Sequence, residues 1–143
     1  MSKTDEIVRT LRHEIEGRDI LEIGCGTADF SISATEFARS VRCIDIDDSR
    51  LSPQIGRSSA VFERMDASKM SFPDGSFDAV FVYNALYHMR DEWDAILAES
   101  RRVLRENGAI FVIGSWKLDR SLMADMFGDV ASNDGFSVVK IEK

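Results

Sequence analysis

The sequence predicts an α/β fold, in which a doubly wound, mostly parallel sheet of about six strands carries helices on both faces. Short apolar runs alternate along the chain with segments of helical periodicity. This alternation favours a parallel sheet, because each helix returns the chain to the edge where the previous strand began. The run FDAVFVY at residues 77–83 suits a strand that is buried on both faces. Two glycines, Gly24 and Gly26, interrupt the chain between the first strand and the next helix.

Length and charge limit the number of domains and the class of partner. With 143 residues the chain is long enough for one sizeable core, and we expect residues 1–143 to form a single domain without linkers. A formal charge of −7 disfavours nucleic acid as a partner, since such binding depends on neutralising phosphates with Lys and Arg. Residues 1–10 lack the apolar segment of a signal peptide, and no stretch approaches the ~20 apolar residues of a membrane span. We therefore expect a cytoplasmic protein without membrane contact.

The first half of the chain predicts two helices and two strands. An apolar stripe indicates an N-terminal helix over about residues 4–16, and its members are Ile7, Val8, Leu11 and Ile15. A short strand at 19–23 follows, then a helix over about 29–39. The next strand, at 41–45, ends in the acidic sequence DIDD.

The second half continues the alternation. A weakly patterned segment at 49–59 predicts one short helix, because Pro53 is tolerated only near a helix start. Helices are expected over about 91–106, where Asn107 and Gly108 form a typical stop, and over about 119–130. Strands are expected at 60–66, 77–83, 109–114 and 136–142.

The glycine corner Gly24-Cys25-Gly26 exposes backbone N–H groups at the carboxyl edge of the sheet, where open α/β folds bind ligands. The predicted helix at 29–39, of about eleven residues, is ~16 Å long, and the predicted five-residue strand at 41–45 has about the same length. The chain therefore returns with Asp45 to the edge of the sheet at which Gly24 lies. A carboxylate there can accept hydrogen bonds from the two hydroxyls of a ribose. The corner and the acid together predict a nucleoside site.

The class of nucleotide depends on the residue at the start of the second helix. A nicotinamide-dependent oxidoreductase also carries a glycine corner and an acid ~20 residues later, but its third glycine would fall at Asp29. A carboxylate at a helix N-terminus repels a pyrophosphate, and no GxxxxGK[ST] sequence is present. These residues favour an unphosphorylated nucleoside.

The chain resembles the class I S-adenosylmethionine-dependent methyltransferases, in particular their small-molecule "type 11" branch. The likeness runs from residue 19 to 113 and rests on ILEIGCGTADF, VRCIDID, FERMDASKMSFPDGSFDAVFVYNALYHM and RVLRENGAIFVI, in the family's order and spacing. The family usually has a glycine where this chain has Ala28. The resemblance implies a Rossmann-like fold with a cofactor-binding core at about 19–114 and a C-terminal helix and strand at about 119–142. It also implies that the C-terminal strand of the usual seven is missing.

The family's pattern assigns roles to the glycine corner and its neighbours. Gly24, Cys25 and Gly26 would let the methionyl part of the cofactor lie on the backbone. Glu22 would attract its ammonium group directly or through water. The carbonyl of Asn84 would lie near the same ammonium group.

The resemblance also assigns the nucleoside contacts. Asp45 would bind the ribose hydroxyls, and Ile46 would pack on the adenine face. Asp66 would accept a hydrogen bond from the adenine amino group, and the N–H of Ala67 would meet a ring nitrogen.

Candidate catalytic residues follow the predicted fourth strand, where the family's acceptor pocket normally opens. His88 or Tyr83, with Tyr87 nearby, could orient an acceptor or take its proton, and both could equally pack the pocket wall. No metal site is expected, because Cys25 and Cys43 form no recognisable zinc pattern with the two histidines and both read as reduced thiols.

The resulting hypothesis is transfer of a methyl group from S-adenosyl-L-methionine to a small-molecule acceptor, with S-adenosyl-L-homocysteine as product. In-line displacement at the sulfonium methyl needs alignment and dehydration rather than a strong base. The alternative is a non-catalytic S-adenosylmethionine-binding or regulatory subunit that acts with a partner protein. Because the chain is short for the family, a homodimer or a partner subunit would complete the acceptor pocket.

Overall fold

The computed structural model describes residues 1–133 and 135–143. In these residues a seven-stranded sheet has the order β3-β2-β1-β4-β5-β7-β6. The pairs from β3 to β5 are parallel, and β7 runs antiparallel to both of its neighbours. The strands are β1 (Asp19–Ile23), β2 (Ser40–Asp45), β3 (Val61–Arg64), β4 (Phe77–Tyr83), β5 (Leu104–Gly114), β6 (Ala131–Asn133) and β7 (Phe136–Glu142).

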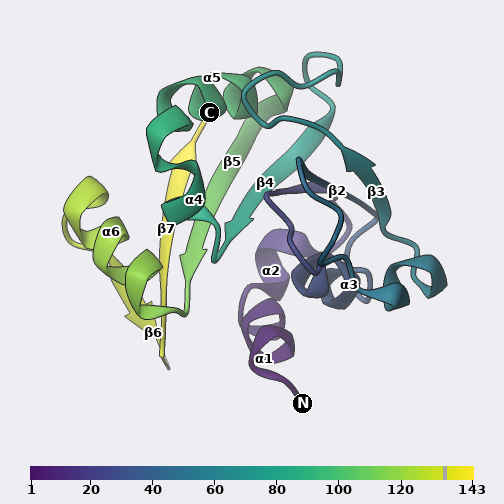
Figure 1. Ribbon diagram of the computed structural model, residues 1–143, viewed down its shortest axis with the longest axis horizontal. Coiled ribbons are helices and arrows are strands. Elements are labelled where there is room, and N and C mark those ends of the chain that lie inside the picture. The colour runs from purple at the N-terminus through teal and green to yellow at the C-terminus, as the bar shows by residue number, and fades with distance from the viewer. Residues whose placement is uncertain (134) are drawn as a thin grey trace.

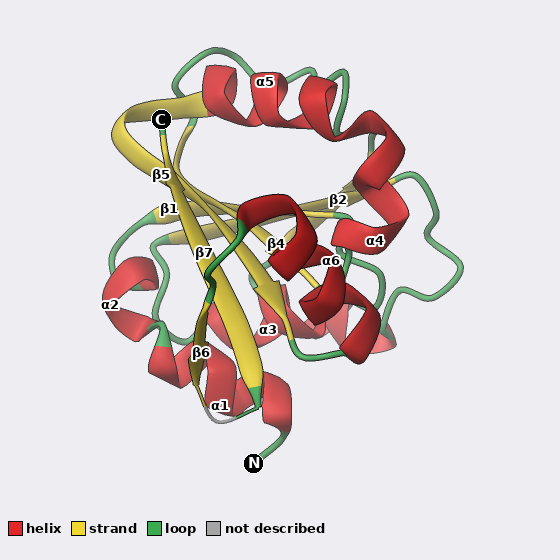
Figure 2. Ribbon diagram, turned by 90° about the vertical axis from the view of Figure 1, so that its left-hand side faces the viewer, coloured by secondary structure: helices red, strands yellow, loops and turns green. Residues whose placement is uncertain are grey.

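Helices cover both faces of the sheet, as the sequence predicts. The elements are α1 (Lys3–Thr10), α2 (Arg12–Ile15), α3 (Asp29–Ala34), η1 (Pro53–Arg57), α4 (Leu86–Met89), η2 (Arg90–Glu92), α5 (Trp93–Val103) and α6 (Lys117–Phe127). Figure 1 shows α1, α2 and α3 together beside one part of the sheet and α4, α5 and α6 beside the other. Turned by 90°, Figure 2 shows α5 on one side of the sheet and α1, α2 and α3 on the opposite side. The predicted α/β class, a mostly parallel sheet with helices on both faces, is confirmed.

The number of strands differs from the prediction of about six. The final strand β7 pairs antiparallel with β5, and the short β6 pairs with β7 at the edge of the sheet. The expectation that the last of the usual seven strands is missing was therefore wrong. The sequence of β6 is ASN, which has no apolar alternation to reveal it, so pairing with β7 makes it a strand.

Several boundaries also differ. The predicted helix at 4–16 is divided at Leu11, whose φ of −95° and ψ of 11° leave the helical region. The predicted helix at 29–39 ends at Ala34, and α4 was not predicted. Strand β5 begins at Leu104, because the chain leaves helix α5 before Asn107 and Gly108 rather than at them. Asn107 has a φ of +67° inside β5, where the register against β4 shifts.

The core near the glycine corner is built from aromatic rings in mutual contact, of which Phe81 and Phe111 are stacked. Phe81 in β4 lies 5.1 Å from Phe30 in α3 and 5.0 Å from Phe111 in β5, measured between ring centroids. Phe30 also lies 5.3 Å from Tyr83. These contacts hold the first turn of α3 against the sheet and so fix the position of the loop before it.

No helix in the described ranges has both the length and the apolar character needed to cross a membrane.

Candidate functional site

The glycine corner follows β1 and lies beside the end of β2. Gly24 and Gly26 have φ values of +63° and +56°, a region that glycine adopts without strain. Cys25 N–H donates to the carbonyl of Ile44 at 3.1 Å, which ties the corner to β2. Ala28, where the family usually has glycine, also has a positive φ of +68°.

Asp45 lies against this corner, at the carboxyl edge of the sheet. The lengths of the predicted helix and strand before it placed it at the same edge. Its Oδ2 accepts a hydrogen bond from the N–H of Gly26 at 2.8 Å, and its Oδ1 accepts one from the N–H of Asp47 at 3.0 Å. Two backbone donors therefore hold the carboxylate in one orientation. The structure places Asp45 as predicted, and its ribose contact stays a prediction.

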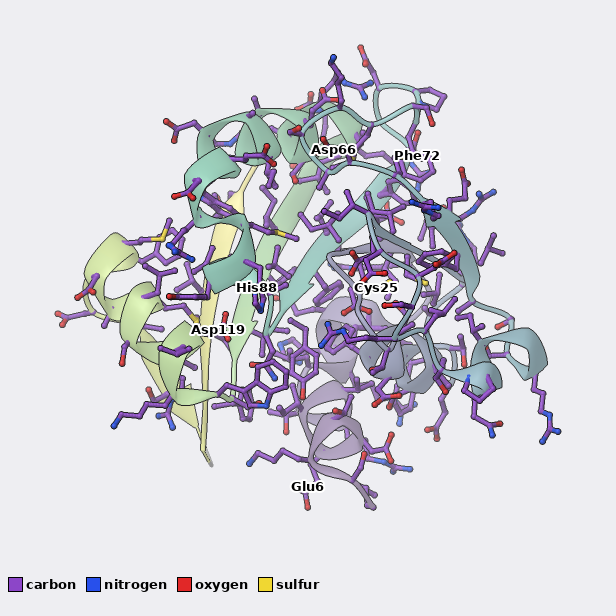
Figure 3. All side chains as sticks on the ribbon, viewed as in Figure 1. Glu6, Cys25, Asp66, Phe72, His88 and Asp119 are labelled. Atoms are coloured by element: carbon purple, nitrogen blue, oxygen red, sulfur yellow. The ribbon has the colours of Figure 1, made fainter. Side chains whose placement is uncertain are left out.

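A cavity of about 350 Å³ opens above the ends of β1, β2 and β4. Among its lining residues are most of those predicted for the cofactor: Gly24, Asp45, Ile46, Asp66, Ala67 and Asn84. Met65, Met89 and the predicted catalytic residue His88 also line it. Figure 3 labels Asp66, in the loop that follows β3, and His88, in α4. The structure thus brings together predicted residues from Gly24 to His88, which lie far apart in the sequence.

A second cavity, of about 450 Å³, adjoins the first. Both are lined by Gly24, Arg50 and Asn84, so the two cavities meet above the glycine corner. The second continues along Tyr83 and Trp116. His88 and Tyr83 consequently line different cavities, and the structure does not bring these two catalytic candidates together.

Asp66 has one oxygen, Oδ2, that accepts no hydrogen bond from any residue the structure describes. Its Oδ1 accepts hydrogen bonds from the hydroxyl and the N–H of Ser68 at 2.7 and 2.9 Å, and these bonds lower the pKa of the Asp66 carboxyl. The group is therefore ionised at neutral pH. Ala67, also in the cavity wall, has an N–H that makes no hydrogen bond to any described residue.

Three predicted cofactor residues lie behind the cavity wall rather than on it: Glu22, Cys25 and Gly26. Glu22 is 1% exposed, and its Oε1 accepts hydrogen bonds from Ser31 Oγ at 2.7 Å and Ser31 N at 3.2 Å. Burial raises the pKa of Glu22 well above its ordinary value. A direct contact between Glu22 and a ligand in either cavity would require this arrangement to change.

Cys25 and Cys43 are free thiols that pack together below the corner. The hydrogen bond between the two side chains, together with burial, raises the pKa of Cys25, so this thiol stays neutral. Among the described residues no group of three or more His, Cys, Asp or Glu side chains is arranged to hold a metal ion.

Two side chains cover the glycine corner. A Cβ added at Gly24 would lie 2.2 Å from Met89 Cε, and a Cβ added at Gly26 would lie 2.7 Å from Arg50 Nη2. Each contact is made by the far end of a flexible side chain. Anything that lies on the corner must therefore displace these ends, and any residue larger than glycine would collide with them.

Asn84 joins the ends of β4 and β5. It has a φ of +51°, and its Oδ1 accepts hydrogen bonds from the N–H groups of Ser115 and Trp116 at 2.8 and 3.3 Å. Its Nδ2 donates to Ser115 Oγ at 2.8 Å. The side-chain oxygen is thus occupied while Nδ2 keeps one further N–H, so the acceptor that Asn84 can offer a ligand is the backbone carbonyl named in the prediction.

Sequence reasoning missed several residues of the two cavities, among them Thr4, Arg50, Ser115 and Trp116. Thr4 Oγ1 and Tyr83 Oη lie 3.0 Å apart, within hydrogen-bond distance, so the N-terminal helix contributes to the second cavity. The position of Ser115 and Trp116 directly after β5 was a usable signal, because the ends of parallel strands meet at one edge. No pattern marked Thr4 or Arg50.

Comparison with known proteins identifies the family. Residues 21–112 match the family described as Methyltransferase domain. The chain is 33% identical over 102 residues to the 27-O-demethylrifamycin SV methyltransferase of Amycolatopsis mediterranei. This alignment covers 66% of the chain and 37% of the relative. It is also 33% identical to the ubiquinone/menaquinone biosynthesis C-methyltransferase of Cupriavidus metallidurans, over 81% of this chain and 50% of that one. The chain thus spans about half or less of the length of these curated relatives.

Comparison with solved structures supports the same family through the fold. The chain superposes on a structure titled as a putative S-adenosyl-L-methionine-dependent methyltransferase from Methanococcus maripaludis with a TM-score of 0.79 at 13% identity, over 98% of this chain and 84% of the other. The family match and the curated relatives confirm the resemblance seen in the sequence, and S-adenosylmethionine is the cofactor of this group. The chain belongs to the class I S-adenosylmethionine-dependent methyltransferases.

Proposed function

We propose that this chain binds S-adenosylmethionine above the glycine corner and transfers its methyl group to a small-molecule acceptor held in the second cavity. The observation that carries the proposal is the meeting of two cavities at Gly24 and Asn84, on the carboxyl edge of a parallel sheet. One cavity suits a nucleoside and the other opens directly beside it. A donor and an acceptor in adjoining cavities can approach each other once the side-chain ends of Met89 and Arg50, which cover the corner, are displaced.

The first cavity fits the adenosine part of the cofactor. Asp45 is held at the edge by two backbone donors, and Asp66 has one free carboxylate oxygen beside the unpaired N–H of Ala67. In this proposal Asp45 accepts hydrogen bonds from the ribose hydroxyls. Asp66 accepts one from the adenine amino group, and the N–H of Ala67 donates one to a ring nitrogen of the adenine. Ile46 lines the same cavity with 69% of its surface exposed, and adenine packing on it would remove apolar surface from water.

The tail of the cofactor would lie on Gly24 and Gly26, where a Cβ has no room. The backbone carbonyl of Asn84 would accept a hydrogen bond from the ammonium group. Glu22 supports the corner from behind, through its hydrogen bonds to Ser31 at the start of α3. We infer that Glu22 acts on the tail through the position of the corner.

We infer that the second cavity suits a planar acceptor that also carries polar groups, because charged side chains line it as well: Lys3, Asp29 and Arg50. Tyr83 and Trp116 contribute aromatic surface to it, while Thr4 and Ser115 contribute hydroxyl groups. Two of the curated relatives are named for 27-O-demethylrifamycin SV and for ubiquinone and menaquinone biosynthesis. We propose an acceptor of similar chemistry, with a ring that stacks on the aromatic side chains and a polar group that meets the hydroxyls.

When bound, the cofactor supplies a methyl group on a positively charged sulfur, which is already activated for displacement. The chain's own residues then have to align the acceptor and exclude water. Tyr83 lies in the acceptor cavity and is the better placed of the two catalytic candidates to orient the acceptor. His88, in the first cavity, stays a candidate through contact with the donor side.

The wider setting of the protein also stays a proposal. The regulatory alternative predicts cofactor binding without turnover, and none of the comparisons favours it. A second copy of the chain or a partner subunit would complete the wall of the acceptor cavity. The cytoplasmic location, the single domain and the exclusion of nucleic acid and membrane as partners are predictions from the sequence.

Thermal unfolding with added ligands tests the proposal, because a ligand that prefers the folded state raises Tm. We expect S-adenosylhomocysteine to raise Tm and NAD to leave it unchanged. Asp45→Ala should remove most of the shift, whereas Asp48→Ala, three residues further and outside both cavity walls, should keep it. Transfer of labelled methyl groups to pools of aromatic metabolites then separates an enzyme from a regulatory subunit. Binding of NAD in place of S-adenosylhomocysteine would contradict the proposal.

A further inference from the structure

Arg50 lies in the loop between β2 and η1, and its guanidinium reaches over the glycine corner. The nearest atoms to a Cβ built at Gly26 are Arg50 Nη2 at 2.7 Å and Arg50 Cζ at 3.6 Å. Arg50 also lines both cavities, a property that it shares with Gly24 and Asn84 alone among the described residues. A long cationic side chain therefore stands where the two cavities meet.

The guanidinium of Arg50 has no acidic partner within the described residues. It makes no ion pair and donates no hydrogen bond there, in contrast to Arg42, which pairs with Glu63 at 2.8 Å, and to Arg64, which donates to the carbonyl of Ile46. Its charge reaches Asp47, whose pKa is lowered mainly by hydrogen bonds from Ser49 and only to a lesser degree by Arg50. The donors of this planar group, of which Nη2 lies nearest the corner, thus have no fixed acceptor among the described residues.

The charges around the corner indicate what this group can bind. Asp45, Asp47 and Asp66 line the first cavity, and Asp29 lines the second. These carboxylates suit the cationic parts of S-adenosylmethionine and repel its one anionic group, the carboxylate of the amino-acid tail. A cation near the tail carboxylate would offset this repulsion, and a guanidinium can donate hydrogen bonds to both carboxylate oxygens at once.

The geometry of Gly26 connects Arg50 to the tail. The N–H of Gly26 donates to Asp45, the predicted ribose anchor, and Arg50 lies over the same glycine. A ribose at Asp45 would therefore place the 5′ substituent of the nucleoside at the corner, within the space that the Arg50 side chain now reaches.

We propose that Arg50 binds the carboxylate of the cofactor's amino-acid tail and thereby lets the site distinguish the intact cofactor from nucleosides that lack the tail. This inference rests on the proposed function, because it presupposes that adenosine occupies the first cavity. On binding, the guanidinium leaves the face of Gly26 and pairs with the carboxylate that takes its place. Arg50 is a specificity-determining residue that contacts the cofactor away from the transferred methyl group.

Calorimetric titration with two ligands tests this assignment. S-adenosylhomocysteine carries the amino-acid tail, and 5′-methylthioadenosine has the same nucleoside and thioether sulfur without it. Arg50→Gln should weaken S-adenosylhomocysteine by about 10- to 100-fold, the range for hydrogen bonds to charged groups, and change 5′-methylthioadenosine by less than about twofold. Arg50→Lys should recover part of the loss, since a single ammonium keeps the charge without the planar fork.

Arg64→Gln is the matched control, because it removes the same charge from a neighbouring position that lines neither cavity. It should leave both affinities within about twofold of wild type. An equal loss for both ligands in Arg50→Gln would overturn the assignment, and so would an unchanged or tighter binding of S-adenosylhomocysteine. If wild type binds neither ligand, the proposed function fails along with the inference. If wild type binds both and Arg50→Gln shows no selective loss, the inference alone fails.

Discussion

Glu22 is a carboxyl group in the middle of the sheet, and its replacement by glutamine has a pH-dependent effect on stability. The side chain is 1% exposed, and its polar contacts are the N–H and hydroxyl of Ser31. Within residues 1–133 and 135–143 no basic side chain forms an ion pair with it. Burial without a cation raises the pKa of Glu22 well above its ordinary value of 4.5.

The sign of the effect follows from the raised pKa. Above pH 4.5 the unfolded chain loses the Glu22 proton while the folded chain keeps it, so the folded state binds more protons. The contribution of Glu22 to stability is fully present below that pH and is lost as pH rises to the folded-state pKa. Over this window the free energy of unfolding falls by up to about 1.4 kcal/mol per pH unit.

Glu22→Gln removes this titration while keeping an oxygen that accepts from Ser31. The stability of the variant relative to wild type should therefore rise with pH, by up to about 1.4 kcal/mol per unit above pH 4.5. Urea unfolding of both proteins at half-unit steps from pH 5 to about 8 measures the difference, in which the other groups cancel. Glu106→Gln, at a side chain that is 90% exposed, gives the baseline for the loss of a surface carboxylate. A difference between Glu22→Gln and wild type that stays constant over the whole range would refute the reasoning.

Three further substitutions test the corner, the strand ends and the core. Gly24→Ala places a Cβ 2.2 Å from Met89 Cε at a φ of +63°, so it should lower the free energy of unfolding in urea by about 1–2 kcal/mol. The variant should also lose most of the Tm shift with S-adenosylhomocysteine, and a full shift would contradict the proposal that the cofactor lies on the glycine corner. Asn84→Ala leaves the backbone groups of Ser115 and Trp116 without their acceptor and should lower the free energy of unfolding by about 1–3 kcal/mol, which an unchanged urea midpoint would disprove. Phe81→Ala empties the centre of the aromatic stack and should cost about 3–5 kcal/mol by the same measurement; a loss below about 1 kcal/mol would mean that the stack is not a tight core.

The sequence specified the central strands well, because their apolar runs are bounded by residues that end strands. The predicted limits of β1 and β4 match those observed, at 19–23 and 77–83. The start of β5 was misplaced, because Asn107-Gly108 reads as the end of a helix when only local signals are used. Here the chain is already paired with β4, and the positive φ of Asn107 falls at an irregularity in the strand.

The position of Glu22 could have been predicted more fully from strand alternation. Side chains two residues apart lie on the same face of a strand, so Glu22 shares its face with Ile20. Ile20 packs in the cluster formed with α1 and α3, while Leu21 and Ile23 pack in the cluster with α5. Glu22 thus points into the layer of α3, where Ser31 meets it, and not along the strand toward the carboxyl edge.

Arg50 and Met89 could not be placed from the sequence, since they lie in a loop and at the end of a short helix, where periodicity gives no direction. Their positions nevertheless explain how a bare glycine corner remains compatible with a stable fold. Met89 covers Gly24 with a terminal methyl on a chain of rotatable bonds, and Arg50 covers Gly26 with an exposed guanidinium. Both can leave by changing rotamers. Uncovering the corner therefore disturbs neither the hydrogen bond from the N–H of Gly26 to the Asp45 carboxylate nor the one from the N–H of Cys25 to Ile44 in β2. A branched or aromatic side chain at either place would fill the same space more rigidly and would have to be expelled from a packed position.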